Sequence, residues 1–223
     1  TGYFYGPNDK AVRNAVHDFV EFELGARWPW GGEVAMKKQP NLRVYTWRNT
    51  WRPQTRLVKR VLRFADAPES EIFAERHRNG EHPAPTPGNS EGVPSVATPV
   101  KFTTLYRVGG EEEAFNEWQA RYNETEAFSF EYELPAPKSV FDWHTAYIIN
   151  KAMLDPYKSF GYWESHYLQS FGAAAREMRK FFQALRDKQD GSAFLESALK
   201  RNDLDDADRA RVEKVQADYA KVK

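Results

Sequence analysis

Four side chains in the second half of the sequence have the chemistry of a metal or acid–base site. Asp142 and His144 are two residues apart, and so are Glu164 and His166. Imidazole and carboxylate groups can together hold a metal ion or move a proton. Within a helix, however, residues two apart point about 200° away from each other, so convergence would need a non-helical turn at both places. Capping, surface and core-edge roles are therefore favoured, with a stand-alone metal-dependent enzyme as the alternative.

Other signatures of catalysis or cofactor binding do not occur in the sequence. There is no cysteine, which excludes disulfides, thiolate nucleophiles, iron–sulfur clusters and zinc ribbons. The phosphate-binding patterns GxxxxGK[ST] and GxGxxG, the HExxH metal motif and the GxSxG nucleophile elbow are all missing. We therefore expect a non-catalytic protein that holds no metal and no cofactor.

A basic aromatic segment, residues 43–63, interleaves arginines with tryptophans. Its basic residues Arg56, Lys59, Arg60 and Arg63 are predicted to form an electrostatic docking surface for an acidic protein or for anionic lipid. The alternative is that the tryptophans anchor a loop and the arginines pair with acidic neighbours in the same chain. With 32 basic against 32 acidic residues, the formal charge is zero, which disfavours a nucleic-acid partner.

A proline-rich stretch divides the chain into three parts. Five of the 13 prolines lie between positions 83 and 99, a composition that favours extended backbone over a packed core. We therefore predict an N-terminal helical region with aromatic loops over 1–79, a linker or strap over 80–99, and a C-terminal helical region over 100–223.

Hydrophobic spacing predicts the elements of the N-terminal region. Apolar residues at helical spacing follow Asn8, and Gly25 is a natural stop for that helix. Pro53 suits the first turn of a second helix over 53–64, and a third is predicted over 68–78. Residues 42–47 alternate weakly and predict a short strand.

The C-terminal region is predicted to be mostly helical after a strand over 100–108. Helices are expected over 111–124 and over 139–152, the second capped by Ser139 with Asp142 three residues later. Asp155-Pro156 should open one long helix that continues to Asp190. A short helix should follow from Ser192, and a final, highly charged helix should begin at Asp203 and include Tyr219. The predicted fold class is mainly α, with a C-terminal helical hairpin or bundle, an irregular N-terminal helical region and minor β structure.

The long helix carries apolar residues at heptad spacing, from Tyr167 to Leu185. Such a stripe can be packed within the chain or can be completed by helices of another chain. The residues predicted to contact a partner are Trp143, Tyr167, Phe171, Met178, Phe181 and Leu185.

Residues 116–160 carry a distinctive pattern, which consists of Asn116-Glu117-Trp118, Tyr122-Asn123-Glu124-Thr125, Leu134-Pro135-Ala136-Pro137, Phe141-Asp142-Trp143, Tyr147, Ile149 and the stretch 154–160. This pattern resembles subunit d of the mitochondrial F-type ATP synthase. The resemblance implies a structural subunit of the peripheral stalk, which keeps the catalytic head from turning with the rotor. It also implies other stalk subunits as partners and a location on the matrix side of the inner mitochondrial membrane. The alternative is a structural subunit or assembly factor of another mitochondrial complex, such as complex I.

Overall fold

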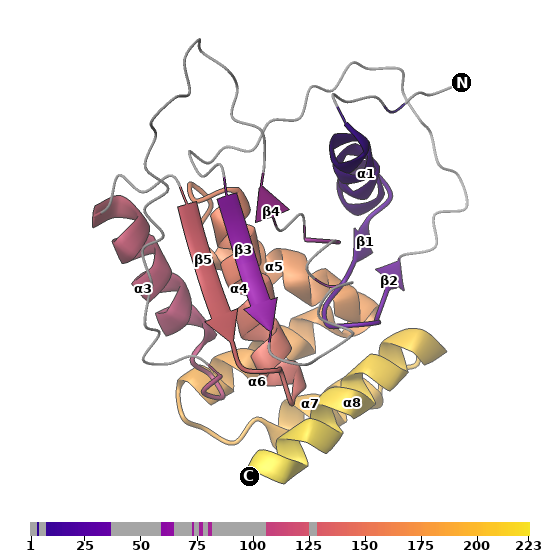
Figure 1. The fold of residues 1–223 in the computed structure, drawn as a ribbon. Helices are drawn as coiled ribbons and strands as arrows, with labels where there is room; N and C mark the ends of the chain where they lie inside the picture. The colour runs from indigo at the N-terminus through magenta and orange to yellow at the C-terminus, as the bar shows by residue number, and fades with distance from the viewer. Residues whose placement is uncertain are drawn as a thin grey trace, which may run out of the picture.

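The computed structural model describes residues 4, 8–36, 59–64, 73, 76–77, 80–81, 106–124 and 129–223. The chain is mainly helical, and the short strands among the described residues form two small sheets (Figure 1). The predicted fold class is therefore confirmed. The strand predicted over 42–47 lies outside the described residues, and so do most of the predicted helix over 68–78 and most of the predicted linker over 80–99. Of the strand predicted over 100–108, only residues 106–108 are described, and they do not form a strand.

The N-terminal part begins with α1 (Asp9–Asp18), which the Asn8 side chain caps by accepting a hydrogen bond from the Ala11 amide at 2.9 Å. The helix continues directly into η1 (Phe19–Glu23), a π-helix, and the chain leaves it at Gly25 with a positive φ of 74°. Helix and stop are therefore confirmed. Two short antiparallel strands follow, β1 (Ala26–Arg27) and β2 (Ala35–Met36).

The second sheet joins segments far apart in the sequence. Its central strand is β3 (Lys59–Phe64), which is antiparallel to β4 (Gly80–Glu81) and parallel to β5 (Ser129–Leu134) (Figure 1). Pairing with β5 is in continuous register from Lys59 opposite Ser129 to Phe64 opposite Leu134. The helix predicted over 53–64 is thus wrong for 59–64, because pairing with a distant strand overrides a weak local preference.

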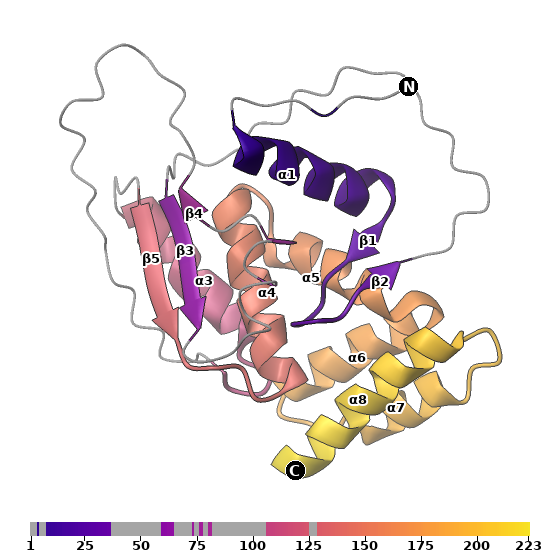
Figure 2. The same cartoon turned by 45° about the vertical axis from the view of Figure 1, so that its right-hand side comes forward.

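Seven helical segments lie in the described residues of the C-terminal part, 106–124 and 129–223. They are α3 (Glu111–Glu124), α4 (Val140–Leu154), α5 (Phe160–Leu168), η2 (Gln169–Ala174, a 3₁₀ helix), α6 (Ala175–Arg186), α7 (Ser192–Leu199) and α8 (Asp206–Val222). Figure 2 shows α7 and α8 side by side, next to α6. The predicted helices over 111–124 and 139–152 are confirmed, and so is the capping of α4 by Ser139 and Asp142.

The single long helix predicted from Asp155 to Asp190 is wrong. It is replaced by α5, η2 and α6, and the chain turns at Gly172, whose φ of 51° and ψ of −122° lie outside helical values. The φ of Gly172 is one that other residues rarely adopt, and a Cβ there would overlap the carboxylate of Asp208 on α8, so glycine is favoured at this crossing. The apolar seam is therefore divided between two helices.

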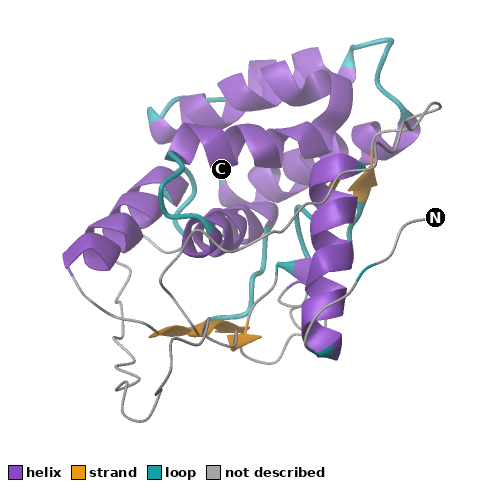
Figure 3. Ribbon diagram, turned by 90° about the horizontal axis from the view of Figure 1, so that it is seen from above, coloured by secondary structure: helices purple, strands orange, loops and turns teal. Residues whose placement is uncertain are grey.

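The core is built around α4, all of whose residues are buried. Trp30 and Phe73 belong to the same core cluster as the helices α3 to α8, so the described residues before and after the linker share one core. Figure 3 shows the strands of the larger sheet at one edge of the molecule, with the helices on one side of them. Within the described residues, no helix has the length and apolar character needed to cross a membrane.

Candidate functional site

The four acidic and imidazole side chains considered as an alternative metal or acid–base site do not form one cluster. Asp142 accepts from the backbone amides of Lys138 and Ser139, at 2.7 and 2.9 Å, and so serves as a helix cap. Glu164 pairs with Arg186 at 2.6 Å and with Arg179 at 3.3 Å. Both carboxylates are therefore engaged in contacts that hold helices in place.

The two histidines of that set are also separated. The His144 ring stacks on Tyr167 with 4.0 Å between centroids, whereas Nδ1 of His166 lies 2.5 Å from the hydroxyl of Tyr147. The described part of the chain contains no group of three or more His, Asp or Glu residues that could hold a metal ion. The arrangement required for the alternative metal enzyme is not formed by these four residues.

The six apolar residues predicted to contact a partner lie in the core of this chain. Tyr167, Phe171, Met178 and Phe181 are 0% exposed, and Trp143 and Leu185 are 6% and 8% exposed. Their assignment as partner contacts is corrected to a core role, because their surfaces are already covered by neighbouring helices. The self-packed alternative for the apolar seam accounts for these residues.

The side chains of the predicted docking surface lie outside what the structure describes. Arg56 lies outside the described residues, and Lys59, Arg60 and Arg63 lie on β3, whose backbone alone is described. A docking role for these four residues stays a prediction.

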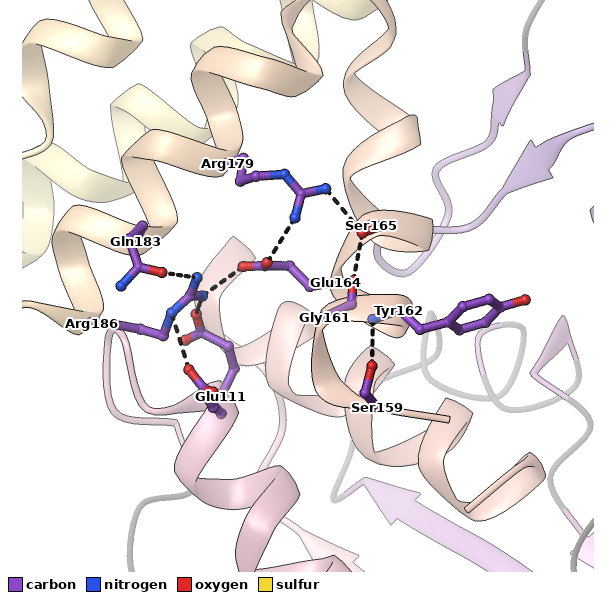
Figure 4. A network of polar contacts seen from close by, with 10 residues as sticks. Glu111, Ser159, Gly161, Tyr162, Glu164, Ser165, Arg179, Gln183 and Arg186 are labelled. Carbon is purple, nitrogen blue, oxygen red and sulfur yellow. Dashed lines mark hydrogen bonds and ion pairs between the residues drawn. The ribbon is translucent and has the colours of Figure 1, made fainter. Parts of the chain in front are cut away.

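A buried ion cluster centred on Arg186 joins α3, α5 and α6 (Figure 4). Nη1 of Arg186 lies 2.7 Å from Glu111 of α3 and 2.6 Å from Glu164 of α5, and all three side chains are less than a tenth exposed. Arg179 reaches Glu164 from the solvent side, and its Nη2 donates to Ser165 at 3.0 Å. We call Glu111, Glu164 and Arg186 the Arg186 cluster.

Burial dominates the electrostatics of this cluster. The pKa of Glu111 is raised by burial, although the guanidinium of Arg186 opposes the shift. Burial also works against the charge of Arg186, but the carboxylates of Glu164 and Glu111 outweigh it and raise its pKa. Arg186 therefore stays cationic.

Two neutral groups adjoin the Arg186 cluster. The pKa of His144 is lowered well below its ordinary value by complete burial and, secondarily, by the charge of Arg186. The pKa of the Tyr167 phenol is raised by burial and by the charge of Glu111. At neutral pH the stacked pair is thus an uncharged imidazole on an un-ionised phenol.

A second buried cluster joins the π-helix η1 to α4 and α5. Lys151 of α4 forms an ion pair with Glu21 of η1, and these side chains are 1% and 0% exposed. Nδ1 of His166 lies 3.9 Å from the same carboxylate. Beside them, the Arg27 guanidinium donates to the backbone carbonyls of Glu21, Ala26 and His166.

A third buried cluster fixes α8 to the rest of the chain. Arg211 of α8 donates from Nε to the Ser170 carbonyl at 2.7 Å, pairs with Glu33 at 2.8 Å and also pairs with Asp208. This contact lies at the crossing where Gly172 passes Asp208. The side chain of Arg211 is 5% exposed, so α8 is attached through a desolvated charge.

Sequence patterns did not identify the centres of these three clusters. Lys151 gives the clearest signal, because it is a cation within the otherwise largely apolar run of residues 140–154 and so requires a buried partner. Its partner Glu21 lies 130 positions earlier, in a helix predicted only from apolar spacing. Arg186 and Arg211 carry no comparable signal, since both lie in highly charged helices.

Comparisons of this chain with protein-family models, with curated proteins and with solved structures gave no match. The clusters must therefore be interpreted from their own geometry. The Arg186 cluster and the Lys151–Glu21 cluster each join helical segments of this chain through buried charges, and Arg211 joins α8 to the carbonyl of Ser170 and to Glu33. Such pairs fix the relative positions of elements, since breaking one leaves an uncompensated buried charge.

Proposed function

We propose that this protein is a non-catalytic structural subunit of a large mitochondrial assembly. The specific candidate is the peripheral stalk of the F-type ATP synthase, on the matrix side of the inner membrane, where the protein would help to hold the catalytic head against rotor torque. The sequence resemblance over residues 116–160 supplies this candidate.

The observation that carries the proposal is the use of the buried charges. Glu21, Lys151, Glu164 and Arg186 all form buried ion pairs between elements of the same chain. Desolvated pairs of this kind resist displacement of one helix against another, because any displacement exposes or separates charges at considerable free-energy cost. Resistance to deformation is the property that a stator subunit needs.

The break at Gly172 changes how such a subunit would work. One long helix would transmit force along its own axis, whereas α5, α6 and α8 are short and held together laterally. Torque would then pass between helices through the buried clusters, with the protein acting as a compact block between longer partners. The proposal therefore no longer depends on a heptad seam shared with another chain.

Exposed aromatic and apolar side chains support the expectation of protein partners. Phe22, Met36, Tyr157 and Tyr162 are 41%, 59%, 77% and 43% exposed. Large apolar groups of this kind act as anchors when a partner covers them. They replace the buried seam residues as the candidates for contact within an assembly.

Native gel electrophoresis of gently solubilised mitochondria tests the proposal directly. The protein, carrying a small C-terminal tag, should migrate with the large band that hydrolyses ATP in the gel. Migration with the band that oxidises NADH would contradict the stalk assignment and identify complex I instead. A protein found only as a free monomer outside mitochondria would overturn the structural role altogether.

Charge reversal tests the predicted docking surface. Replacing Arg56, Lys59, Arg60 and Arg63 with glutamate should reduce the amount of protein recovered in the assembly, because the change removes attraction to an acidic surface. A matched control reverses four exposed basic residues of the helical part, Arg176, Lys180, Lys188 and Lys200. Equal recovery of both variants, each folded, would remove the docking role of residues 56–63.

A further inference from the structure

Two polar atoms at the centre of the helical core have no hydrogen-bond partner among the described residues. They are Nε2 of His144 and the hydroxyl oxygen of Tyr167. His144 is 1% exposed and Tyr167 is 0% exposed, so bulk water does not reach either side chain. Nearly all buried polar atoms in folded proteins are hydrogen-bonded, either to protein or to ordered water. Two buried atoms without a hydrogen-bond partner therefore require an explanation.

The two side chains that carry these atoms lie against each other in the core. The rings of His144 and Tyr167 stack nearly parallel, with centroids 4.0 Å apart and planes 15° apart. Phe182 lies against the His144 ring at 4.6 Å, and Phe171 lies against the Tyr167 ring at 5.7 Å. These aromatic neighbours cover the pair but cannot accept or donate a conventional hydrogen bond.

The stacked pair of His144 and Tyr167 adjoins the Arg186 cluster. The charge of Glu111 contributes to the raised pKa of Tyr167, and the charge of Arg186 contributes to the lowered pKa of His144. Both groups are therefore neutral and close enough to the cluster to sense it. A neutral phenol is a donor and an acceptor, and Nε2 of a neutral imidazole is one or the other according to its tautomer.

We propose that the core binds an internal water molecule between the Tyr167 hydroxyl and Nε2 of His144, beside the Arg186 cluster. Water is the ligand that fits this chemistry, because it donates and accepts and so satisfies either tautomer of His144. It is also small enough for a position where both side chains are at most 1% exposed. This inference is independent of the proposed function, since it concerns how the core is completed.

Replacing Tyr167 with phenylalanine tests the water site in solution. The variant keeps the ring and its stacking but loses the hydroxyl, so the folding equilibrium constant should fall about threefold to tenfold, as for one lost hydrogen bond. Tyr147→Phe is the matched control, because that hydroxyl lies 2.5 Å from Nδ1 of His166 and its loss should have a similar effect. An unchanged or larger folding constant for Tyr167→Phe alone would overturn the proposal, since removal of an unsatisfied hydroxyl is harmless or favourable.

Density maps at a resolution that shows ordered water provide the second measurement. The wild-type protein, alone or in its assembly, should show a peak within hydrogen-bonding distance of both the Tyr167 hydroxyl and His144 Nε2. The peak should disappear in Tyr167→Phe. A wild-type map without the peak overturns the proposal even if the variant is unstable or fails to fold.

Discussion

Gly172, Asp208 and Arg211 meet where the 3₁₀ helix η2 passes α8. Gly172 has a φ that other residues rarely adopt, and Asp208 occupies the space that a side chain at this position would need. Asp208 in turn pairs with Arg211, which donates to the carbonyl of Ser170. A change in one residue is therefore transmitted to the attachment of a whole helix.

Substitution of Gly172 by alanine should destabilise the protein by about 2–4 kcal/mol. The new Cβ would be strained at positive φ and would displace the Asp208 carboxylate from Arg211. Gly161→Ala is the matched control, because Gly161 lies in α5 and a Cβ there meets nothing within 4 Å. That variant should be neutral or more stable by up to about 1 kcal/mol, given the higher helix propensity of alanine. Equal urea midpoints for the two variants would contradict the role given to Gly172.

Arg186 is expected to be the most sensitive residue of its cluster. Arg186→Met should cost about 3–5 kcal/mol, because Glu111 would lose its buried cation and Glu164 would keep only the half-exposed Arg179. Arg179→Met is the control, since its side chain is 47% exposed and should contribute about 1 kcal/mol or less. Chemical denaturation of both variants gives the comparison, and similar losses of stability would show that the buried position of Arg186 is not what matters.

His144 should make the stability of the protein depend on acid pH. The imidazole of His144 stays neutral in the folded protein, whereas in the unfolded chain it gains a proton below about its ordinary pKa of 6.5. The contribution of His144 to the free energy of unfolding is therefore complete above that pH and is lost as the pH falls. The advantage of wild type over His144→Phe should therefore shrink by about 1.4 kcal/mol per pH unit between about pH 6 and pH 5. His17→Phe, at a half-buried histidine of α1, is the control. Parallel pH curves for wild type and His144→Phe would contradict the prediction.

At the scale of elements, α4 is held at its N-terminus by two acidic residues from different helices. Asp142 closes the local capping box, and Asp218 of α8 accepts a hydrogen bond from the Val140 amide at 3.0 Å. Burial tends to raise the pKa of Asp218, but hydrogen bonds from Lys221 and Val140 outweigh it and lower the pKa. The last helix of the chain thereby caps the central one.

Asp218→Ala should cost about 1–2 kcal/mol and should loosen α8. The amide of Val140 should exchange with solvent deuterium faster, because it loses its acceptor. Asp206→Ala, at an exposed position in the first turn of the same helix, should change stability by about 0.5 kcal/mol and leave the Val140 amide protected. Unchanged exchange at Val140 in the Asp218 variant would show that the interhelical cap does not hold.

Local patterns predicted the elements whose signals lie within a few residues. The cap at Ser139, the acidic first turn before Phe115 and the stop at Gly25 are all short-range features, and the corresponding helices are present. The strand β3 could not be found in the same way, because its conformation depends on pairing with β5. The break at Gly172 was missed because apolar spacing continues on both sides of it.

The buried clusters were harder to predict than the helices. Glu164 and His166 were singled out as a pair, yet they belong to different clusters, one on Arg186 and the other beside Glu21. Their partners come from elements that approach only in the folded chain. Residue type and spacing could indicate that these groups need partners, but could not identify them.

At the scale of the whole molecule, the regions on both sides of the proline-rich stretch should unfold together. Trp28 and Trp30 are buried in the first region, and Trp118, Trp143 and Trp163 are buried in the second. Because Trp30 and Phe73 belong to the same core cluster as α3 to α8, urea transitions followed by tryptophan fluorescence and by helical circular dichroism should coincide. Two separated transitions would instead indicate that the N-terminal region folds independently.

The parallel pairing of β3 with β5 sets the order in which the polypeptide can mature. A ribosome completes Lys59–Phe64 well before it makes Ser129–Leu134. Until β5 has been made, the edge of β3 that pairs with it has no partner strand from β5. Unpaired strand edges invite association with other chains, and long-range pairings form slowly. Nascent chains that stop short of position 129 should therefore depend on chaperones far more than chains that extend through α4.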